Sequence, residues 1–318
     1  NEFTRAVTPE GNLTAQALVS EMFELRPSFE WRGLGEVPYS ALKIRPAYAA
    51  FDAERRFELG YRSVADNKAC ECGAILRGVL ASGVPARRVR ATTRSQESRD
   101  RLSQETGVQV LSSEADAEAN RRAVEGADIV MLGVKPYAIL ELCDDIRPAL
   151  APSTVVVSVA AGVNMAAMAG HLPEGQPIVR SMPNTPSSVG HGALSLTAGD
   201  HVTEDQAAAV DEVLSAVGVV VQVPEEQISA VTGVSGSGPA YVFLLAEMMQ
   251  KAGERLGLDA QTARTLAKQT VSGAGRLLEA PDADPEALRK AVTSPNGTTE
   301  RAIETFLDSG IEDLVARA

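Results

Sequence analysis

Histidine, cysteine and aromatic residues are scarce in this chain of 318 residues, which has three histidines, three cysteines and 4% aromatic residues. The histidines stand at no metal-ligand spacing from one another or from a cysteine, which argues against a His-based metal site and a Ser/His/Asp triad. So few cysteines indicate no disulfide framework, and the N-terminus lacks the basic-then-apolar pattern of a secretion signal. We therefore expect no metal and a reducing, cytoplasmic location.

Basic residues and long apolar runs are lacking as well. The 30 Lys and Arg are outnumbered by 42 Asp and Glu, for a formal net charge of −12, whereas nucleic-acid binding needs clustered basic residues. No uninterrupted apolar run approaches the roughly 18 residues of a membrane-spanning helix. With 44% hydrophobic residues the chain is typical of a soluble globular protein. The expected partner is a small molecule, with no nucleic acid and no membrane.

Helical and strand-like segments alternate from about residue 74 to 223. Apolar runs such as Ile129–Val134 and Thr154–Val159 are typical of parallel strands covered on both faces. The pattern predicts an α/β fold with a Rossmann-type doubly wound sheet. Turn-forming residues interrupt every candidate element in residues 1 to about 66. The expected domains are an extension of unknown role (1–62), a dinucleotide-binding domain (63–224) and a helical domain (225–318). The predicted helices are 74–80, 97–105, 114–125, 139–150 and 239–249, and the predicted strands are 88–93, 108–110, 129–134, 154–159, 178–180 and 218–223.

The stretch Pro239–Met249 starts with proline in the first turn and is apolar nearly all round. A helix of this kind must be buried on every side, which is difficult within a domain of about 94 residues. A partner subunit that supplies part of the cover is the favoured interpretation. Burial against the first domain is the alternative.

Five motifs in this order resemble those of the pyrroline-5-carboxylate reductase family. They are Val134-Lys135-Pro136, Ala160-Ala161-Gly162-Val163, Met182-Pro183-Asn184-Thr185-Pro186, Ser235-Gly236-Ser237-Gly238-Pro239-Ala240-Tyr241 and Val292-Thr293-Ser294-Pro295-Asn296-Gly297-Thr298-Thr299. The resemblance covers about three quarters of the chain, from about residue 73 to 315. It implies NAD(P)H-dependent reduction of pyrroline-5-carboxylate to proline, and self-association as a dimer or a ring of dimers.

The last motif reads as a loop that turns into a helix, and the free N–H groups of a helix N-terminus bind carboxylates well. The resemblance assigns the substrate carboxylate to Ser294 and to the backbone of Gly297 and Thr298. It places Thr299, as the catalytic residue, near the ring nitrogen, and Val292 beside the ring. The alternative is an ordinary helix cap made by Thr298 or Thr299.

Thr92, Thr93 and Arg94 follow the second strand of the dinucleotide-binding unit, where such folds bind the adenosine ribose. An arginine flanked by hydroxyls favours the 2′-phosphate of NADPH, with NADH as a second donor. A merely solvated surface arginine is the alternative. By resemblance, the rest of the cofactor groove is lined by Asn120, Gly133, Val134, Lys135, Pro136, Ala160, Ala161 and Gly162.

The residues before Gly73 depart from the family pattern. The family has a glycine-rich turn there, whereas this chain reads Asp66-Asn67-Lys68-Ala69-Cys70-Glu71-Cys72. Side chains would crowd the pyrophosphate, and Asp66 and Glu71 would repel it. Either this segment has diverged and weakens cofactor binding, or it does not belong to the functional chain; the abrupt return of the pattern at Gly73 favours the second. Cys70 and Cys72 form half a metal site without a second half.

Two other functions remain open. A β-hydroxyacid dehydrogenase or imine reductase of similar build would share the fold, and the former would use a lysine for which Lys251 is the candidate. The missing glycines favour a catalytically silent NADP- or proline-binding protein.

Overall fold

The computed structural model describes residues 28–30, 36–38, 61–65 and 71–318, with side chains from Cys72 onward. Contacts divide the chain into two units, Asn1–Arg56 and Phe57–Ala318. In the first unit, β1 (Ser28–Glu30) and β2 (Glu36–Pro38) form an antiparallel pair. The sequence pattern predicted neither strand. Most of the predicted extension (1–62) lies outside the described residues, as do Asp66 and Cys70.

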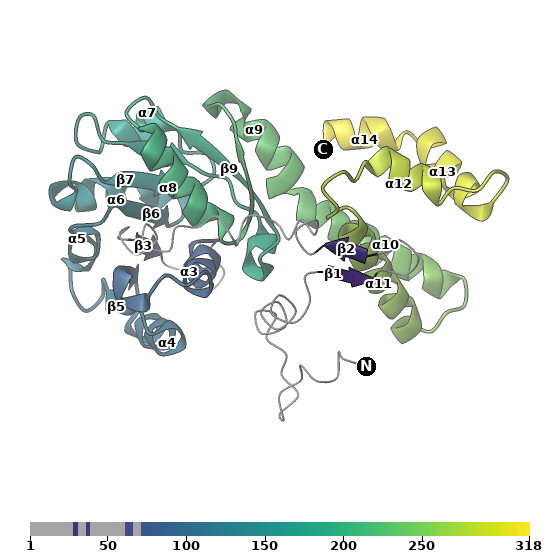
Figure 1. Cartoon of the computed structure of the whole chain (residues 1–318), viewed down its shortest axis with the longest axis horizontal. Helices are drawn as coiled ribbons and strands as arrows, with labels where there is room; N and C mark the ends of the chain where they lie inside the picture. Colours follow the sequence, from purple (N-terminus) through teal and green to yellow (C-terminus); the bar gives the residue numbers. More distant parts are fainter. Residues whose placement is uncertain (1–27, 31–35, 39–60, 66–70) are drawn as a thin grey trace. The chain divides into compact units, whose positions relative to one another are not determined.

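The second unit contains a sheet of eight strands in the order β10-β9-β8-β7-β6-β3-β4-β5 (Figure 1). Six of them, from β5 to β8, run parallel in the order of a dinucleotide-binding fold, with β3 between β4 and β6. This confirms the predicted α/β class and doubly wound sheet. The strands are β3 (Tyr61–Ala65), β4 (Val89–Thr93), β5 (Gln109–Ser112), β6 (Ile129–Gly133), β7 (Val155–Ser158), β8 (Ile178–Arg180), β9 (Gly192–Ala198) and β10 (Gly218–Gln222).

Helices cover both faces of this sheet. Alternate residues of β6 belong to opposite cores: Ile129 and Met131 pack in one, Val130 and Leu132 in the other. The first core is completed by helices α3 and α8, and the second by α6 and α7. A strand buried on both faces needs apolar residues at every position, which is why β6 reads as a continuous apolar run. The helices are α3 (Glu71–Ala81), α4 (Gln96–Thr106), α5 (Ala119–Val124), α6 (Ile139–Ile146), α7 (Met165–Ala169) and α8 (Glu204–Ser215).

The elements of the sheet domain that were not predicted include β9, α7 and α8. Strand β9 is rich in small and hydroxyl-bearing residues, so it carries neither an apolar run nor a strong β signal. It pairs antiparallel with β8 and parallel with β10, and so joins the predicted last strand to the sheet. The predicted helix 114–125 is shorter than expected, because residues 113–118 form the turn that leads into α5.

The chain beyond Pro224 is helical, as predicted. A π-helical turn, η9 (Thr232–Gly236), lies between the first two of its helices. These helices are α9 (Ile228–Val231), α10 (Gly238–Arg255), α11 (Ala260–Leu277), α12 (Pro285–Ala291), α13 (Thr298–Asp308) and α14 (Ile311–Arg317).

Large apolar side chains of α10 are exposed in the single chain, among them Phe243 at 66% and Met248 at 56%. Among the described residues, one helical stretch, Glu225–Arg255, is long and apolar enough to cross a membrane, and 6% of its most apolar window is buried. The sequence prediction considered uninterrupted apolar runs only and therefore missed it. This test is weak evidence for a membrane span, because core helices of soluble proteins pass it too.

Candidate functional site

The carboxyl ends of β4, β6 and β7, which lie on the two sides of β3, carry most of the predicted cofactor residues. Thr92 and Thr93 end β4, Gly133 ends β6, and Ala160 lies two residues after β7. The end of β3 is beside them, since Ala65 pairs with Gly133. Parallel strands bring their carboxyl ends to one edge of the sheet, and ligands of open α/β sheets bind there, at the point where the strand order reverses. In this sheet that point lies between β3 and β6.

Arg94 stands at this edge on a fixed backbone. Its carbonyl oxygen accepts hydrogen bonds from the Ser112 hydroxyl at 2.8 Å and from the Glu114 N–H at 3.1 Å, while the Thr93 hydroxyl donates to the Ser95 carbonyl. The Arg94 side chain is exposed, and its guanidinium has no ion pair within the described part of the chain. A positioned arginine with its charge unneutralised suits a phosphate group. These residues therefore fit the 2′-phosphate end of NADPH.

The other predicted cofactor residues differ in their exposure and in the hydrogen bonds that they already make. Asn120 is the second residue of α5, and its amide donates to the Asp145 carboxylate at 3.0 Å, which leaves its carbonyl oxygen for a ligand. Val134 is half-buried, whereas Lys135 and Pro136 are exposed at the start of a 3-10 turn. Ala161 and Gly162 are exposed after β7, and Gly162 has φ +79°. Gly162 therefore supplies a backbone conformation that other residues rarely adopt.

The residues that connect β3 to α3 do not suit the cofactor's pyrophosphate. They hold the position at which dinucleotide folds wrap the pyrophosphate with a glycine-rich turn and a helix N-terminus. Between Ala65 and Cys72 this chain has no glycine and two carboxylates, Asp66 and Glu71. The described residues at the end of β4 thus suit a ribose phosphate, whereas the sequence of residues 66–71 opposes a pyrophosphate.

The predicted substrate loop lies between α12 and α13. Gly297 is the N-cap of α13, its N–H donates to the Ser294 carbonyl at 3.0 Å, and no side chain caps the helix. Thr298 and Thr299 are the first two helical residues, and their N–H groups find no partner among the described residues. The alternative that either threonine caps the helix is therefore wrong.

Two further contacts hold this loop. Asn296 has φ +58°, and its N–H donates to the Glu300 carboxylate at 2.7 Å, so the carboxylate folds back outside the helix end. A Cβ added at Gly297 would lie 2.9 Å from the Ser294 carbonyl oxygen, so the turn requires glycine there. Ser294, Thr298 and Thr299 are exposed, and Val292 is 65% exposed. The loop thus presents exposed hydroxyls and helix N–H groups next to an apolar side chain, a combination that suits a carboxylate.

Within this single chain the substrate loop and the cofactor edge remain separate sets of residues. Helix α13 packs mainly against α14, and the loop residues are exposed rather than buried against the sheet. The structure therefore groups the cofactor residues together and the substrate residues together, but it does not join the two groups.

Asn184 is a residue to which the sequence analysis assigned no role. It is 7% exposed; its amide donates to the Ser235 carbonyl at 3.0 Å, and its side-chain oxygen accepts from the Ala193 N–H at 2.9 Å. A Cβ added at Gly236 would lie 2.9 Å from the Met182 methyl group. Two motifs that are about 50 residues apart thus meet at η9. The only signal in the sequence was that both motifs belong to one family.

The described residues give no support to Lys251 as a catalytic lysine or to a metal site. The Lys251 ammonium is hydrogen-bonded to Glu247 on the exposed side of α10, which lowers the pKa of Glu247. Among the described residues no group of three His, Cys, Asp or Glu could hold a metal ion.

Two family models match the part of the chain from residue 71 onward. Residues 225–318 match the model "Pyrroline-5-carboxylate reductase dimerisation", and residues 71–162 match "NADP oxidoreductase coenzyme F420-dependent". A pyrroline-5-carboxylate reductase from Pseudomonas aeruginosa is 43% identical over 246 residues, which cover 77% of this chain and 88% of the relative. The structure of a pyrroline-5-carboxylate reductase from Coxiella burnetii is 36% identical with a TM-score of 0.76, over 81% of this chain and 94% of that one.

The N-terminal residues are similar to a different protein. Residues 1–84 match the model "Hydrogenase formation hypA family", and 79 residues are 78% identical to the hydrogenase maturation factor HypD of Cupriavidus necator, of which they cover 21%. The match to the hydrogenase formation model overlaps the match to the NADP oxidoreductase model at residues 71–84, which include α3. The sequence before Gly73 is thus similar to a family other than the one that the rest of the chain matches. From α3 to its last residue, the chain belongs to the pyrroline-5-carboxylate reductase family.

Proposed function

We propose that this chain reduces the cyclic imine of L-1-pyrroline-5-carboxylate to L-proline, the last step of proline biosynthesis, with NADPH as hydride donor and NADH as a second donor. The observation that carries the proposal is the start of α13, where Gly297 is the N-cap and the N–H groups of Thr298 and Thr299 have no partner within the described part of the chain. Family membership supports the same conclusion.

The substrate loop binds and orients the imine. The Ser294 hydroxyl and the backbone of Gly297 and Thr298 hold the carboxylate, where the positive end of the helix dipole favours negative charge. Val292 borders the ring, and the Thr299 hydroxyl holds the ring nitrogen. The imine nitrogen takes its proton from water, so no strong protein acid is needed, and positioning supplies much of the rate. NADPH, when bound, supplies the hydride to the imine carbon.

The cofactor residues have distinct roles in this proposal. Thr92, Thr93 and Arg94 hold the 2′-phosphate, which selects NADPH. The backbone segments 133–136 and 160–162, with Asn120, line the rest of the groove at the carboxyl edge of the sheet. The domain division 1–62, 63–224 and 225–318 separates the N-terminal extension, cofactor binding, and substrate binding with dimerisation.

Self-association completes the proposal. The dimerisation match over residues 225–318 and the exposed apolar side chains of α10 support a dimer, with larger rings of dimers built from it. The proposed location is the cytoplasm, without nucleic-acid or membrane partners.

The test is NADPH consumption with pyrroline-5-carboxylate, compared between the unaltered chain, Thr299→Val and Thr299→Ser. Valine has the shape of threonine without the hydroxyl, so we expect kcat/KM to fall about 100-fold, while serine keeps most of the activity. Cofactor binding, followed by NADPH fluorescence, stays the same in all three. Full activity of Thr299→Val would remove Thr299 from the mechanism.

The β3–α3 turn favours a second candidate, a silent NADP- or proline-binding protein. The double substitution Lys68→Gly and Cys70→Gly restores a G-x-G-x-x-G pattern that ends at Gly73. If pyrophosphate binding limits the chain, we expect the KM for NADPH to fall about tenfold or more, because each backbone hydrogen bond to a charged group contributes about 1.5–3 kcal/mol. Proline binding by calorimetry, with no turnover before or after the substitutions, would instead identify the silent protein.

A further inference from the structure

Glu225 is the first residue of the helical domain, and its carboxylate contacts two segments of the sheet domain. One carboxylate oxygen accepts hydrogen bonds from the Arg180 guanidinium and from the Met165 N–H, both at 2.8 Å. Arg180 is the last residue of β8, and Met165 is the first residue of α7. A single side chain thus joins segments that lie 45 and 60 positions away from it in the sequence.

The ion pair between Arg180 and Glu225 is largely buried. The Arg180 side chain is 8% exposed and the Glu225 side chain 31%. Taking two charges out of water is costly, and apolar residues of similar volume are often as stabilising as a buried ion pair. Stability alone therefore gives little reason for two charges at this position. The second hydrogen bond of Glu225, from the backbone of α7, indicates what else the carboxylate does.

The segment between β7 and α7 contains the predicted cofactor residues 160–162. Gly162 is exposed with φ +79°, and a Cβ added there would meet no atom of the described residues within 4 Å. The backbone at Gly162 therefore gains no support from packing, and its position depends on how the two ends of the segment are held. At one end the Ala160 N–H donates to the Ser158 hydroxyl at 3.3 Å, and at the other end the Met165 N–H donates to the carboxylate.

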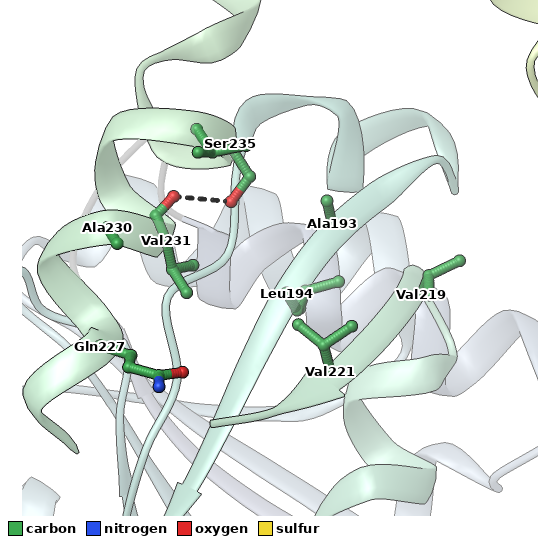
Figure 2. Close-up of a pocket in the computed structure, with 9 residues that line it drawn as sticks. Ala193, Leu194, Val219, Val221, Gln227, Ala230, Val231 and Ser235 are labelled. Carbon is green, nitrogen blue, oxygen red and sulfur yellow. Dashed lines mark hydrogen bonds between the residues drawn. The ribbon is translucent and has the colours of Figure 1, made fainter. Parts of the chain in front are cut away.

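The start of the helical domain is itself fixed to the sheet domain, so Glu225 is a firm anchor. Elements α9 and η9 lie opposite β9 and β10, with Val231 and Leu194 among the side chains that line the apolar groove between them (Figure 2). The Ser235 hydroxyl donates to the Val231 carbonyl at 2.9 Å (Figure 2), and the Ser235 carbonyl accepts from the Asn184 amide at 3.0 Å. This part of the helical domain is thus held to the sheet domain at both ends.

We propose that Glu225 is a positioning residue for the cofactor, which holds the segment 160–164 through the Met165 N–H while Arg180 holds Glu225 in place. This role rests on the proposed function, in which residues 160–162 line the cofactor groove. Glu225 is not one of the residues assigned to the cofactor or to the substrate, so it acts through this segment. Its carboxylate therefore links the domain that carries the substrate loop to the groove for NADPH.

The test compares Glu225→Gln, in which the side-chain amide oxygen can still accept from the Met165 N–H, with Glu225→Ala, in which no acceptor remains. Glu226→Ala is the matched control, because Glu226 is the next residue and its side chain is exposed. Glu225→Ala leaves Arg180 buried without its partner, which destabilises the fold. The double variant Arg180→Met with Glu225→Met removes both charges together and still lacks the acceptor, so it replaces Glu225→Ala if that variant does not fold.

The first readout is hydrogen exchange of residues 160–167 in the chain without cofactor. We expect these amides to exchange about tenfold faster in Glu225→Ala and in the double variant, the effect of losing one hydrogen bond to a charged group. Glu225→Gln and Glu226→Ala should exchange like the unaltered chain. Equal exchange in all the chains would overturn the proposal. Equally fast exchange in Glu225→Gln and Glu225→Ala would also overturn it, because the ion pair rather than the contact with Met165 would then hold the segment.

The second readout is the Kd for NADPH and for NADH, measured by the fluorescence of the cofactor. Both should rise about tenfold in Glu225→Ala, because residues 160–162 follow β7 and not the strand that carries Arg94. The KM for pyrroline-5-carboxylate should stay the same. Faster exchange with an unchanged Kd would refute the role toward the cofactor. If the unaltered chain reduces no imine, the proposed reductase fails, and hydrogen exchange still decides whether Glu225 holds the segment.

Discussion

Replacing Asn184 with alanine tests whether this side chain joins the sheet domain to the helical domain. The amide makes two hydrogen bonds, to the Ser235 carbonyl and from the Ala193 N–H, in a residue that is 7% exposed. Each such bond contributes about 0.5–1.5 kcal/mol, and a buried partner left unsatisfied costs about 1–3 kcal/mol. We therefore expect Asn184→Ala to lower the free energy of unfolding by about 2–4 kcal/mol.

The assay is urea denaturation at one fixed protein concentration, because the stability of a dimer depends on concentration. Asn164→Ala is the control: Asn164 is an exposed N-cap that accepts one hydrogen bond, from the Ala167 N–H at 2.8 Å, so its loss should cost about 1 kcal/mol. If Asn184→Ala costs no more than Asn164→Ala, the side chain does not join the domains and the reasoning fails.

Asn184→Asp separates the two hydrogen bonds. A carboxylate still accepts from the Ala193 N–H but has no hydrogen for the Ser235 carbonyl. The protonated acid can donate, so folding should raise the pKa of the introduced carboxyl group above its unfolded value. Its stabilising contribution is then fully present below about pH 4 and is lost as the pH rises through the folded pKa. If the loss of unfolding free energy in Asn184→Asp does not depend on pH, the hydrogen bond to the Ser235 carbonyl is unimportant.

Three further predictions follow from single residues. Arg94→Ala should raise the KM for NADPH about tenfold or more and leave that for NADH unchanged; equal effects on both would exclude a 2′-phosphate contact. Asp259 caps α11, and hydrogen bonds from Thr262 lower its pKa. Asp259→Ala should therefore lower the melting temperature at pH 7, and the difference should disappear as the pH falls through the folded pKa, whereas a constant difference would argue against the charged cap. Burial, with the charge of Asp144, raises the pKa of the Cys143 thiol to about 12; at pH 8 it should react with a thiol reagent only after unfolding, and fast labelling of the folded chain would contradict its burial.

The sequence by itself determined the sheet class and the main strands. A strand covered on both faces must be apolar at successive positions, so β6 and β7 could be recognised from their residues alone. The substrate loop was equally local, because a helix start needs only a glycine, hydroxyl groups and the break before them. The departure from the family pattern before Gly73 was also visible, although only comparison with known proteins showed that residues 1–84 resemble another family.

Other features depended on tertiary structure. Strand β9 has weak local signals and exists because β8 and β10 flank it in the sheet. The role of Asn184 depends on contacts with residues 9 and 51 positions away, which no local pattern encodes. Val219 and Val221 of β10 are exposed because tertiary folding covers one face of this strand, whereas their sequence alone predicted a buried strand. Local patterns specify which faces are apolar, but only the packed chain decides which of those faces remain for a partner.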